Sequence, residues 1–253
     1  MKTKFILNIE NLYKSFGGNQ VLENLSFKVF PDQITAIIGK SGTGKSVLLK
    51  TIAGLLDLDS GRVEAFNTSA DGMFSKCKLK ELGFSYMFQS NALFDTMDTY
   101  QNIALPLIES SQEFSKREID KKVDLLLQKL ELVSARNKYP DQMSGGMKKR
   151  VAFARAIITE PKIVLFDEPT TGLDPERKSI VYEMIKLYKK QIGFSALIVS
   201  HDIPEIYEIA DNLIWLDEGK IKFSGTINEI EKVPDQIVKN YLKTGRINSK
   251  ISL

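Results

Sequence analysis

The sequence predicts an α/β fold with an N-terminal antiparallel β region and an inserted α-helical lobe. Three observations indicate this class. A glycine-rich segment at residues 39–46 follows the apolar run 34–38 and leads into a run with helical character. Residues 99–133 have helical spacing with no β signal. Later apolar runs each end in polar residues, as parallel strands that meet at one edge of a sheet do: 84–89, 162–168 and 195–201.

The segment at 39–46 has the composition of a phosphate-binding loop. Its residues are Gly39, Lys40, Ser41, Gly42, Thr43, Gly44, Lys45 and Ser46. Glycines let backbone N–H groups turn inward around phosphate oxygens, and the helix that follows directs its positive dipole end at the anion. Lys45 can reach the β- and γ-phosphates, and the Ser46 hydroxyl can bind Mg²⁺. The segment therefore predicts a nucleotide site.

Composition limits the classes of function. The chain has 253 residues, of which 43% are hydrophobic, enough for a substantial core. A net charge of +3 with 26% charged residues favours neither a nucleic-acid-binding protein nor an enzyme for acidic substrates. The single cysteine, Cys77, excludes an intrachain disulfide and favours a reducing cytoplasm. Without a signal peptide or a run long enough to span a bilayer, we expect a chain that acts at membranes only through a partner.

The N-terminal region alternates apolar and polar residues around a turn at Gly17 and Gly18, which predicts antiparallel strands over residues 4–30. Phe16 lies just before this turn, where its ring could stack on a nucleotide base or could belong to the core. A further short strand is expected at 62–66.

The helical lobe is predicted over about 90–160. Its clearest signal is an apolar stripe at helical spacing, formed by Ile119, Val123, Leu126, Leu127, Leu130 and Leu132. After the lobe the α/β pattern returns. We expect helices at 175–190 and from 204 onward, and a hairpin over 213–223.

Several polar residues at the predicted strand ends have the chemistry that phosphoryl transfer needs. Asp167 suits holding Mg²⁺ beside Ser46, directly or through water. Glu168, the next residue, would point elsewhere and can polarise an attacking water as a general base. Gln89 can bind both the metal and the water through its amide oxygen. His201, the only histidine, can donate a hydrogen bond to the γ-phosphate as charge spreads onto it.

A second anion-binding element is predicted at Ser144, Gly145, Gly146 and Met147, ahead of a helical run. A hydroxyl, free N–H groups and a helix dipole again suit a phosphate. Because one chain with one phosphate loop hardly needs two such sites, we expect two copies to pair head to tail around a two-fold axis. ATP would then lie between the loop of one copy and Ser144 of the other.

With these ordered motifs, the chain resembles the ATP-binding subunit of ABC transporters nearly from end to end. The resemblance implies a single ABC ATPase domain over 1–253, with a RecA-like P-loop NTPase core, that hydrolyses ATP with Mg²⁺. It assigns Walker A to residues 39–46, Walker B to 163–167, the catalytic glutamate to Glu168, the Q-loop to Gln89, the signature motif to 144–147, the D-loop to 172–174, the H-loop to His201 and the A-loop aromatic to Phe16. We also expect Thr51 and Asp174 to contribute to nucleotide binding. Met147 stands where most of the family has Gln.

Residues 88–97 and 102–107 are similar to a narrower group, the ATPases of lipid transporters that work with MCE-domain proteins, of the maintenance-of-lipid-asymmetry type. This resemblance implies a homodimer on the cytoplasmic face of the inner membrane, beneath two permease subunits. It places the permease's coupling helix near residues 88–107. It also implies an MCE-domain lipid-binding protein, an accessory subunit and phospholipid transport between inner and outer membrane.

Two other functions are consistent with the same motifs: the ATPase of a different ABC importer or exporter, and an ABC ATPase that signals through a membrane partner without transport. The basic stretch at 239–253 is expected to be a solvated tail or a segment that docks on a partner subunit.

Overall fold

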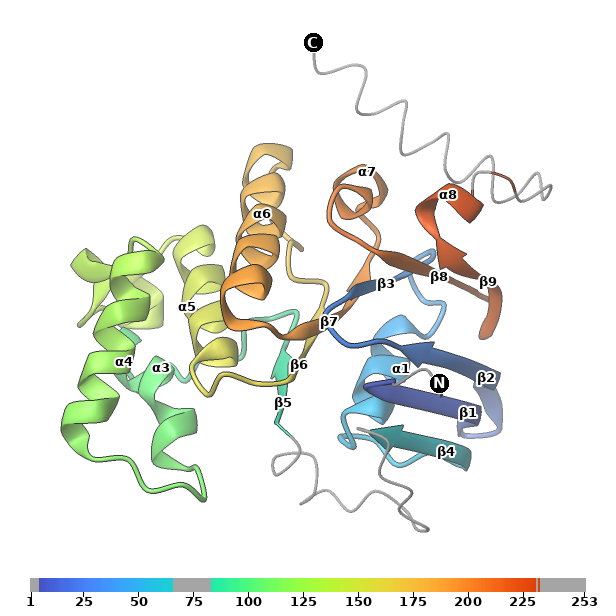
Figure 1. Cartoon of the computed structure of the whole chain (residues 1–253), viewed down its shortest axis with the longest axis horizontal. Helices are drawn as coiled ribbons and strands as arrows, with labels where there is room; N and C mark the ends of the chain where they lie inside the picture. Colours follow the sequence, from blue (N-terminus) through green and yellow to red (C-terminus); the bar gives the residue numbers. More distant parts are fainter. Residues whose placement is uncertain (1–4, 66–82, 231, 233–253) are drawn as a thin grey trace.

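The computed structural model describes residues 5–65, 83–230 and 232, and its strands form two sheets (Figure 1). The smaller sheet has the order β2-β1-β4, and its strands pair antiparallel: β1 (Leu7–Phe16), β2 (Asn19–Val29) and β4 (Ser60–Ala65). Gly17 and Gly18 form the tight turn between β1 and β2, both with positive φ, which glycine adopts without a steric penalty. The predicted N-terminal antiparallel region is confirmed.

The larger sheet has six strands in the order β5-β6-β7-β3-β8-β9. They are β3 (Ile34–Ile38), β5 (Phe84–Met87), β6 (Ile163–Asp167), β7 (Ser195–Ser200), β8 (Asn212–Asp217) and β9 (Lys220–Thr226). The first five are parallel, and β9 returns antiparallel to β8 as the predicted hairpin. The central strands are buried on both faces, which explains why they read as continuous apolar runs.

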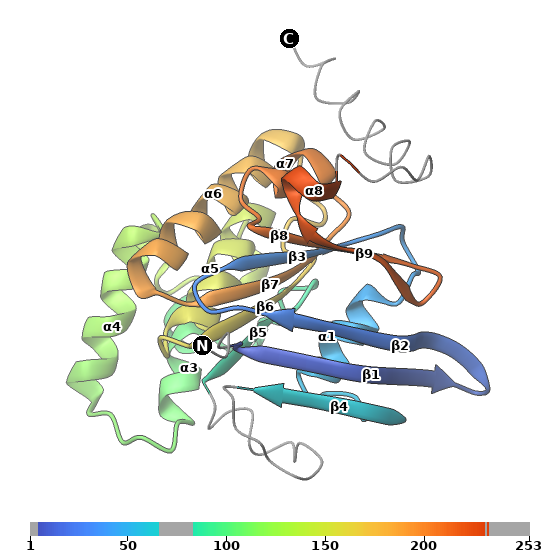
Figure 2. The same cartoon turned by 45° about the vertical axis from the view of Figure 1, so that its right-hand side comes forward.

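Helix α1 (Lys45–Ile52) lies between the two sheets (Figure 2). Its Leu48, Leu49 and Ile52 side chains are fully buried and join one hydrophobic cluster with residues from both sheets. The phosphate-binding segment therefore runs from the central strand β3 directly into a helix that is covered on two sides.

The remaining helices cover the other face of the larger sheet or extend beyond its β5 edge. They are α3 (Thr99–Ile108), α4 (Lys116–Lys129), α5 (Gly145–Ile157), α6 (Pro175–Ile192), α7 (Ile203–Tyr207) and α8 (Ile227–Ile230), with 3₁₀ turns η1 (Val133–Ala135) and η2 (Pro140–Gln142). Capping boxes at Asp98 and Ser115 start α3 and α4. The apolar stripe of α4 packs inward, as its spacing predicts, and the α/β fold class with a helical insertion is confirmed.

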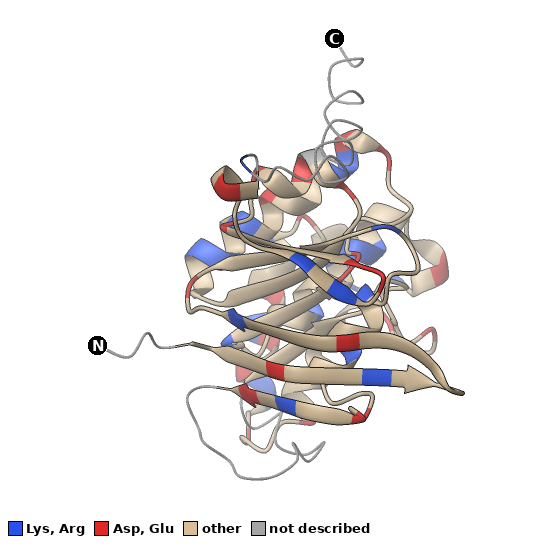
Figure 3. Ribbon diagram, turned by 90° about the vertical axis from the view of Figure 1, so that its right-hand side faces the viewer, with Lys and Arg blue, Asp and Glu red and all other residues tan. Residues whose placement is uncertain are grey.

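Acidic and basic residues both occur along the described part of the chain. Acidic and basic residues are interspersed in the ribbon view of Figure 3. None of the helices in the described part of the chain is both long and apolar enough to cross a membrane. Cys77 and the basic stretch at 239–253 lie outside the described residues.

Candidate functional site

The predicted phosphate loop connects β3 to α1, and contacts within the chain fix its shape. A Cβ atom on Gly39 would lie 2.1 Å from the Leu216 carbonyl oxygen, and one on Gly44 would lie 2.8 Å from a Leu22 methyl carbon. Gly44 also has a φ of 94°, in the region that favours glycine. Both glycines are therefore required by the fold of this chain itself.

Lys45 begins α1 and is buried, with only 4% of its surface exposed. Its ammonium group donates to the carbonyl oxygens of Gly39 and Lys40, at 2.8 and 2.7 Å, and so lies inside the loop. Burial lowers the pKa of Lys45, while the charges of Glu168 and Asp167 act in the opposite direction. A buried cation inside a glycine-rich loop suits a polyanionic ligand.

Asp167, at the end of β6, is buried and accepts two hydroxyl hydrogen bonds. Ser46 Oγ donates to Oδ1 at 2.7 Å, and the Tyr86 phenol donates to Oδ2 at 2.9 Å. Burial and the negative charge of Asp167 raise the pKa of Tyr86, so the phenol remains a donor. The structure thus brings together Ser46 and Asp167, two of the three predicted metal ligands, and adds Tyr86, which the sequence did not reveal.

Glu168 lies where the chain turns out of β6, and its φ of 46° departs from strand geometry. Its backbone N–H donates to the Val199 carbonyl oxygen at 3.0 Å. Such a conformation costs about 1–3 kcal/mol for a residue with a side chain and is a feature of functional sites. Strand alternation predicted that the Glu168 side chain points away from that of Asp167. In the structure, the turn after β6 separates the two side chains instead.

The Glu168 carboxylate contacts three polar side chains from separate segments of the chain. Gln89 donates its amide N–H to Oε2 at 3.0 Å, and the Thr171 hydroxyl donates to the same oxygen at 2.8 Å. His201 Nδ1 lies 3.4 Å from Oε1. Three predicted residues, Gln89, Glu168 and His201, therefore meet at the carboxyl edge of the sheet beside Asp167.

Lys149 on α5 is a further buried cation at this edge that the sequence analysis missed. Its ammonium donates to the Gln89 carbonyl oxygen at 2.8 Å, and burial lowers its pKa against the opposing charge of Glu168. Its spacing could have revealed it, because it falls on the same helical stripe as the buried Ala152, Phe153 and Ala156.

Asp202, next to His201, anchors the segment after β7. Its carboxylate accepts hydrogen bonds from Lys178, Thr170 and Tyr182, and its Oδ1 lies 3.8 Å from His201 Nε2. Burial alone would raise the pKa of Asp202, but the bonds from Lys178 and Thr170 outweigh it and lower the pKa. This arrangement fixes the backbone on which His201 is carried.

Some predicted site residues lie away from this cluster: Phe16, Thr51, Asp174 and the segment at 144–147. The Phe16 ring, at the β1–β2 turn, is 45% exposed, so it is not a core residue. Thr51 lies farther along α1, where its hydroxyl donates to the Val47 carbonyl oxygen. Asp174 caps α6 by accepting from the Arg177 N–H.

The segment at residues 144–147 starts α5, on the opposite face of the large sheet from α1. Ser144 Oγ accepts a hydrogen bond from the Met147 N–H at 3.3 Å. Among the described residues, no hydrogen bond or ion pair connects this segment to the loop at 39–46. A single chain therefore does not bring the two predicted phosphate-binding elements together.

Comparison with known proteins identifies the family. The profile of the family described as ABC transporter matches residues 22–171. The chain belongs to the ABC transporter ATP-binding family. Its activity is ATP hydrolysis, as the sequence predicted.

Two curated relatives match this ABC ATPase along most of its length. A chloroplast protein of Arabidopsis thaliana named trigalactosyldiacylglycerol 3 is 35% identical over 262 residues, covering 97% of this chain and 75% of the relative. A methionine import ATP-binding protein of Campylobacter jejuni is 33% identical over 254 residues, covering 94% of this chain and 75% of the relative.

Solved structures have the same fold as this ABC ATPase. A subunit of the CbiONQ ABC transporter complex from Clostridium perfringens has a TM-score of 0.79 and 29% identity, covering 99% of this chain and all of that chain. A dimeric ATP-binding cassette in a post-hydrolysis state with ADP and phosphate has a TM-score of 0.75 and 27% identity, covering 87% and 98%.

Proposed function

We propose that two copies of this ABC ATPase bind ATP head to tail between residues 39–46 of one copy and 144–147 of the other, and that hydrolysis drives a membrane permease. The observation that carries the proposal is the Glu168 carboxylate. It lies beside the phosphate loop in a strained backbone and is in contact with Gln89, Thr171 and His201. A dimeric relative with bound ADP and phosphate supports the pairing.

Each residue of the cluster has a distinct role in hydrolysis. Lys45 binds the β- and γ-phosphates, replacing its bonds to loop carbonyls. Glu168 accepts the proton of the attacking water as the water oxygen bonds to the γ-phosphorus and the bond to the ADP oxygen breaks. Gln89 orients that water, and His201 donates to the departing phosphate. Phe16, Thr51 and Asp174 complete the proposed nucleotide contacts.

The residues present fit a magnesium ion. Ser46 and Asp167 supply a hydroxyl and a carboxylate whose oxygens lie 2.7 Å apart, and the amide oxygen of Gln89 is the proposed third protein ligand. In the described part of the chain, no group of three or more His, Cys, Asp or Glu residues is placed to form a metal site. Magnesium uses such sparse protein ligands because phosphate oxygens and water complete its shell, and it would neutralise phosphate charge here.

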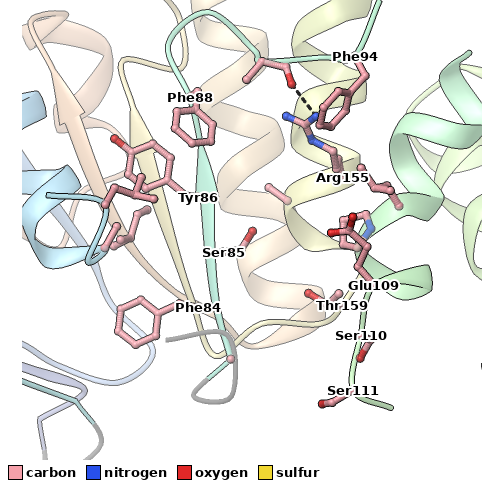
Figure 4. Close-up of a pocket in the computed structure, with 18 residues that line it drawn as sticks. Phe84, Ser85, Tyr86, Phe88, Phe94, Glu109, Ser110, Ser111, Arg155 and Thr159 are labelled. Carbon is pink, nitrogen blue, oxygen red and sulfur yellow. Dashed lines mark hydrogen bonds between the residues drawn. The ribbon is translucent and has the colours of Figure 1, made fainter. Parts of the chain in front are cut away.

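A groove between β5 and α3 suits the coupling helix of a permease (Figure 4). Its volume is about 1040 Å³, and its lining is mainly apolar. Phe88, Phe94 and Leu105 line it, within the region that sequence similarity assigned to the permease contact. Arg155 closes one wall, held by the carbonyl oxygens of Asn91 and Ala92. Docking there would place the protein at the cytoplasmic face of the inner membrane.

Lipid is the cargo that we favour, with an MCE-domain protein and an accessory subunit as further partners. The similarity of residues 88–107 to that group supports this, as does a 35% identical relative whose name refers to a glycerolipid. A methionine import protein is almost as similar, so another import cargo is the second candidate.

Reconstitution tests the cargo. The ATPase, purified with its permease, is placed in liposomes that carry a fluorescent phospholipid, and transport is followed with wild-type protein and with Glu168→Gln. We expect ATP-dependent lipid movement with the wild-type protein and none with the variant. ATP hydrolysis without lipid movement, together with uptake of a soluble solute, would favour the import function. Hydrolysis that moves neither would favour a signalling ATPase.

A further inference from the structure

Tyr86 contributes to two sites, the groove and the predicted metal site. It lies on β5, where it lines the groove together with Phe84 and Phe88 (Figure 4). Its ring centroid is 4.4 Å from that of Phe88, with the two planes tilted by 47°. At its other end, its hydroxyl donates to Asp167 Oδ2 at 2.9 Å. One rigid side chain therefore connects the groove wall with the predicted metal carboxylate.

We propose that Tyr86 is a positioning residue that orients Asp167 for the metal and transmits occupancy of the groove to that carboxylate. The inference rests on the proposed function, which places magnesium at Asp167 and a permease helix in the groove. It adds Tyr86 and a direct physical connection between the metal site and the groove.

The carboxylate plane of Asp167 is fixed because both oxygens are held. Ser46 on α1 donates to Oδ1, and Tyr86 on β5 donates to Oδ2. With the phenol removed, one bond would remain and the carboxylate could rotate about it. A metal ligand held in one orientation binds its ion more tightly than one that must be ordered first.

The aromatic contact gives the groove access to this bond. A side chain that enters the groove against Phe88 meets a ring in contact with Tyr86. Because the hydroxyl lies at the far end of the same ring, a small tilt changes its distance to Asp167. Coupling is reciprocal, so an occupant that alters metal affinity has its own affinity altered by metal to the same degree.

The first experiment uses Tyr86→Phe, which keeps the ring and removes the hydroxyl. Binding of a fluorescent, non-hydrolysable ATP analogue to the full chain is measured in EDTA and across a Mg²⁺ titration. We expect unchanged affinity in EDTA and a Mg²⁺ midpoint raised about 10- to 100-fold, the range expected when a hydrogen-bond partner of a metal ligand is removed. An unchanged or lowered midpoint would overturn the proposal.

Tyr100→Phe is the matched control. The Tyr100 hydroxyl also donates to a carboxylate, Asp120, between α3 and α4 and away from the predicted metal ligands. We expect its Mg²⁺ midpoint to equal that of the wild type. An equal shift in both variants would mean a general effect of losing a tyrosine–aspartate bond, and would refute the positioning role.

The second experiment adds bulk to the part of the groove lined by α3, with Leu105→Trp. If Tyr86 transmits occupancy, this change moves the Mg²⁺ midpoint by about threefold or more in the otherwise wild-type chain and not in the Tyr86→Phe background. Equal shifts in both backgrounds, or none in either, would refute transmission. A wild-type chain whose ATP binding did not depend on Mg²⁺ at all would instead refute the proposed metal site itself.

Discussion

Two glycine-rich turns precede helices in this molecule, and their surroundings differ. In the turn before α1, added Cβ atoms on Gly39 and Gly44 would collide with Leu216 and Leu22. In the turn that starts α5, added Cβ atoms on Gly145 and Gly146 would meet nothing within 4 Å. The first pair of glycines is required by the chain's own packing, and the second pair is not.

The polar contacts differ in the same way. The first turn encloses the Lys45 ammonium and is joined to β6 through Ser46 and Asp167. The second has the capping bond of Ser144, at 3.3 Å. Glycine lowers helix stability, so two glycines at this position without an internal packing reason are consistent with the proposed close approach of a second copy. Contacts within the chain hold the first turn, whereas we propose that a second copy of the chain completes the second.

The largest effect is expected at Glu168, the proposed general base beside the first turn. Glu168→Gln should reduce ATP turnover about 10²- to 10⁴-fold, because the amide cannot accept the proton of the attacking water. ATP binding and the ATP-dependent dimer should persist. Phosphate release and sedimentation measure the two properties.

Glu160→Gln is the control for this change. Glu160 also has a positive φ, but its carboxylate forms an ion pair with Lys122 on α4. Turnover should stay at the wild-type rate. Normal hydrolysis by Glu168→Gln would remove Glu168 from the role of base.

The next effect tests whether the first turn binds nucleotide within one chain. Lys45→Ala should weaken ATP binding about 10- to 100-fold, because charge-assisted bonds to phosphate are lost. Titration calorimetry measures this directly. Lys50→Ala, in the last turn of the same helix, should leave affinity unchanged. Equal affinities in the wild type and Lys45→Ala would contradict the loop assignment.

A pair of alanine variants tests the comparison most directly. Gly44→Ala should destabilise the single chain by roughly 1–3 kcal/mol, because its φ is positive and its Cβ would meet Leu22. Gly146→Ala should leave the free energy of unfolding unchanged or raise it by up to about 1 kcal/mol. In the Glu168→Gln background, Gly146→Ala should weaken the ATP-dependent dimer about tenfold or more.

Denaturant unfolding and sedimentation with ATP distinguish these outcomes. A Gly146→Ala chain that dimerises with unchanged affinity would show that the second turn does not approach a partner closely. A Gly146→Ala chain that unfolds more easily would show an internal requirement that the described contacts lack.

The smallest effect concerns the segment that carries His201. Asp202→Asn should lower stability at pH 7 by about 1 kcal/mol, because Lys178 loses its charged partner. The folded-state pKa of Asp202 is lowered, so its contribution is present above the ordinary value of 3.8 and is lost as pH falls below it. The stability difference between variant and wild type should therefore shrink in acid. Asp57→Asn serves as a surface control, and a pH-independent difference would contradict the charge argument.

Most of the fold could be predicted from the sequence, because buried parallel strands and a glycine turn leave strong local patterns. The meeting of Gln89, Glu168 and His201 followed from one rule, that parallel strands end at one edge of a sheet. Tyr86 and Asp202 could not be found this way. Their partners depend on which strand lies beside which, and β5 pairs with β6 across more than 70 residues of intervening sequence.

The position of α1 between two sheets has a consequence for how the protein unfolds. Its buried residues pack against strands of both sheets. The helix therefore cannot unfold unless the two sheets separate. Its amide hydrogens should exchange with deuterated solvent as slowly as those of the deepest strands, only when the whole domain opens. We therefore expect α1, which follows the proposed nucleotide-binding loop, to be among the last parts of the molecule to unfold.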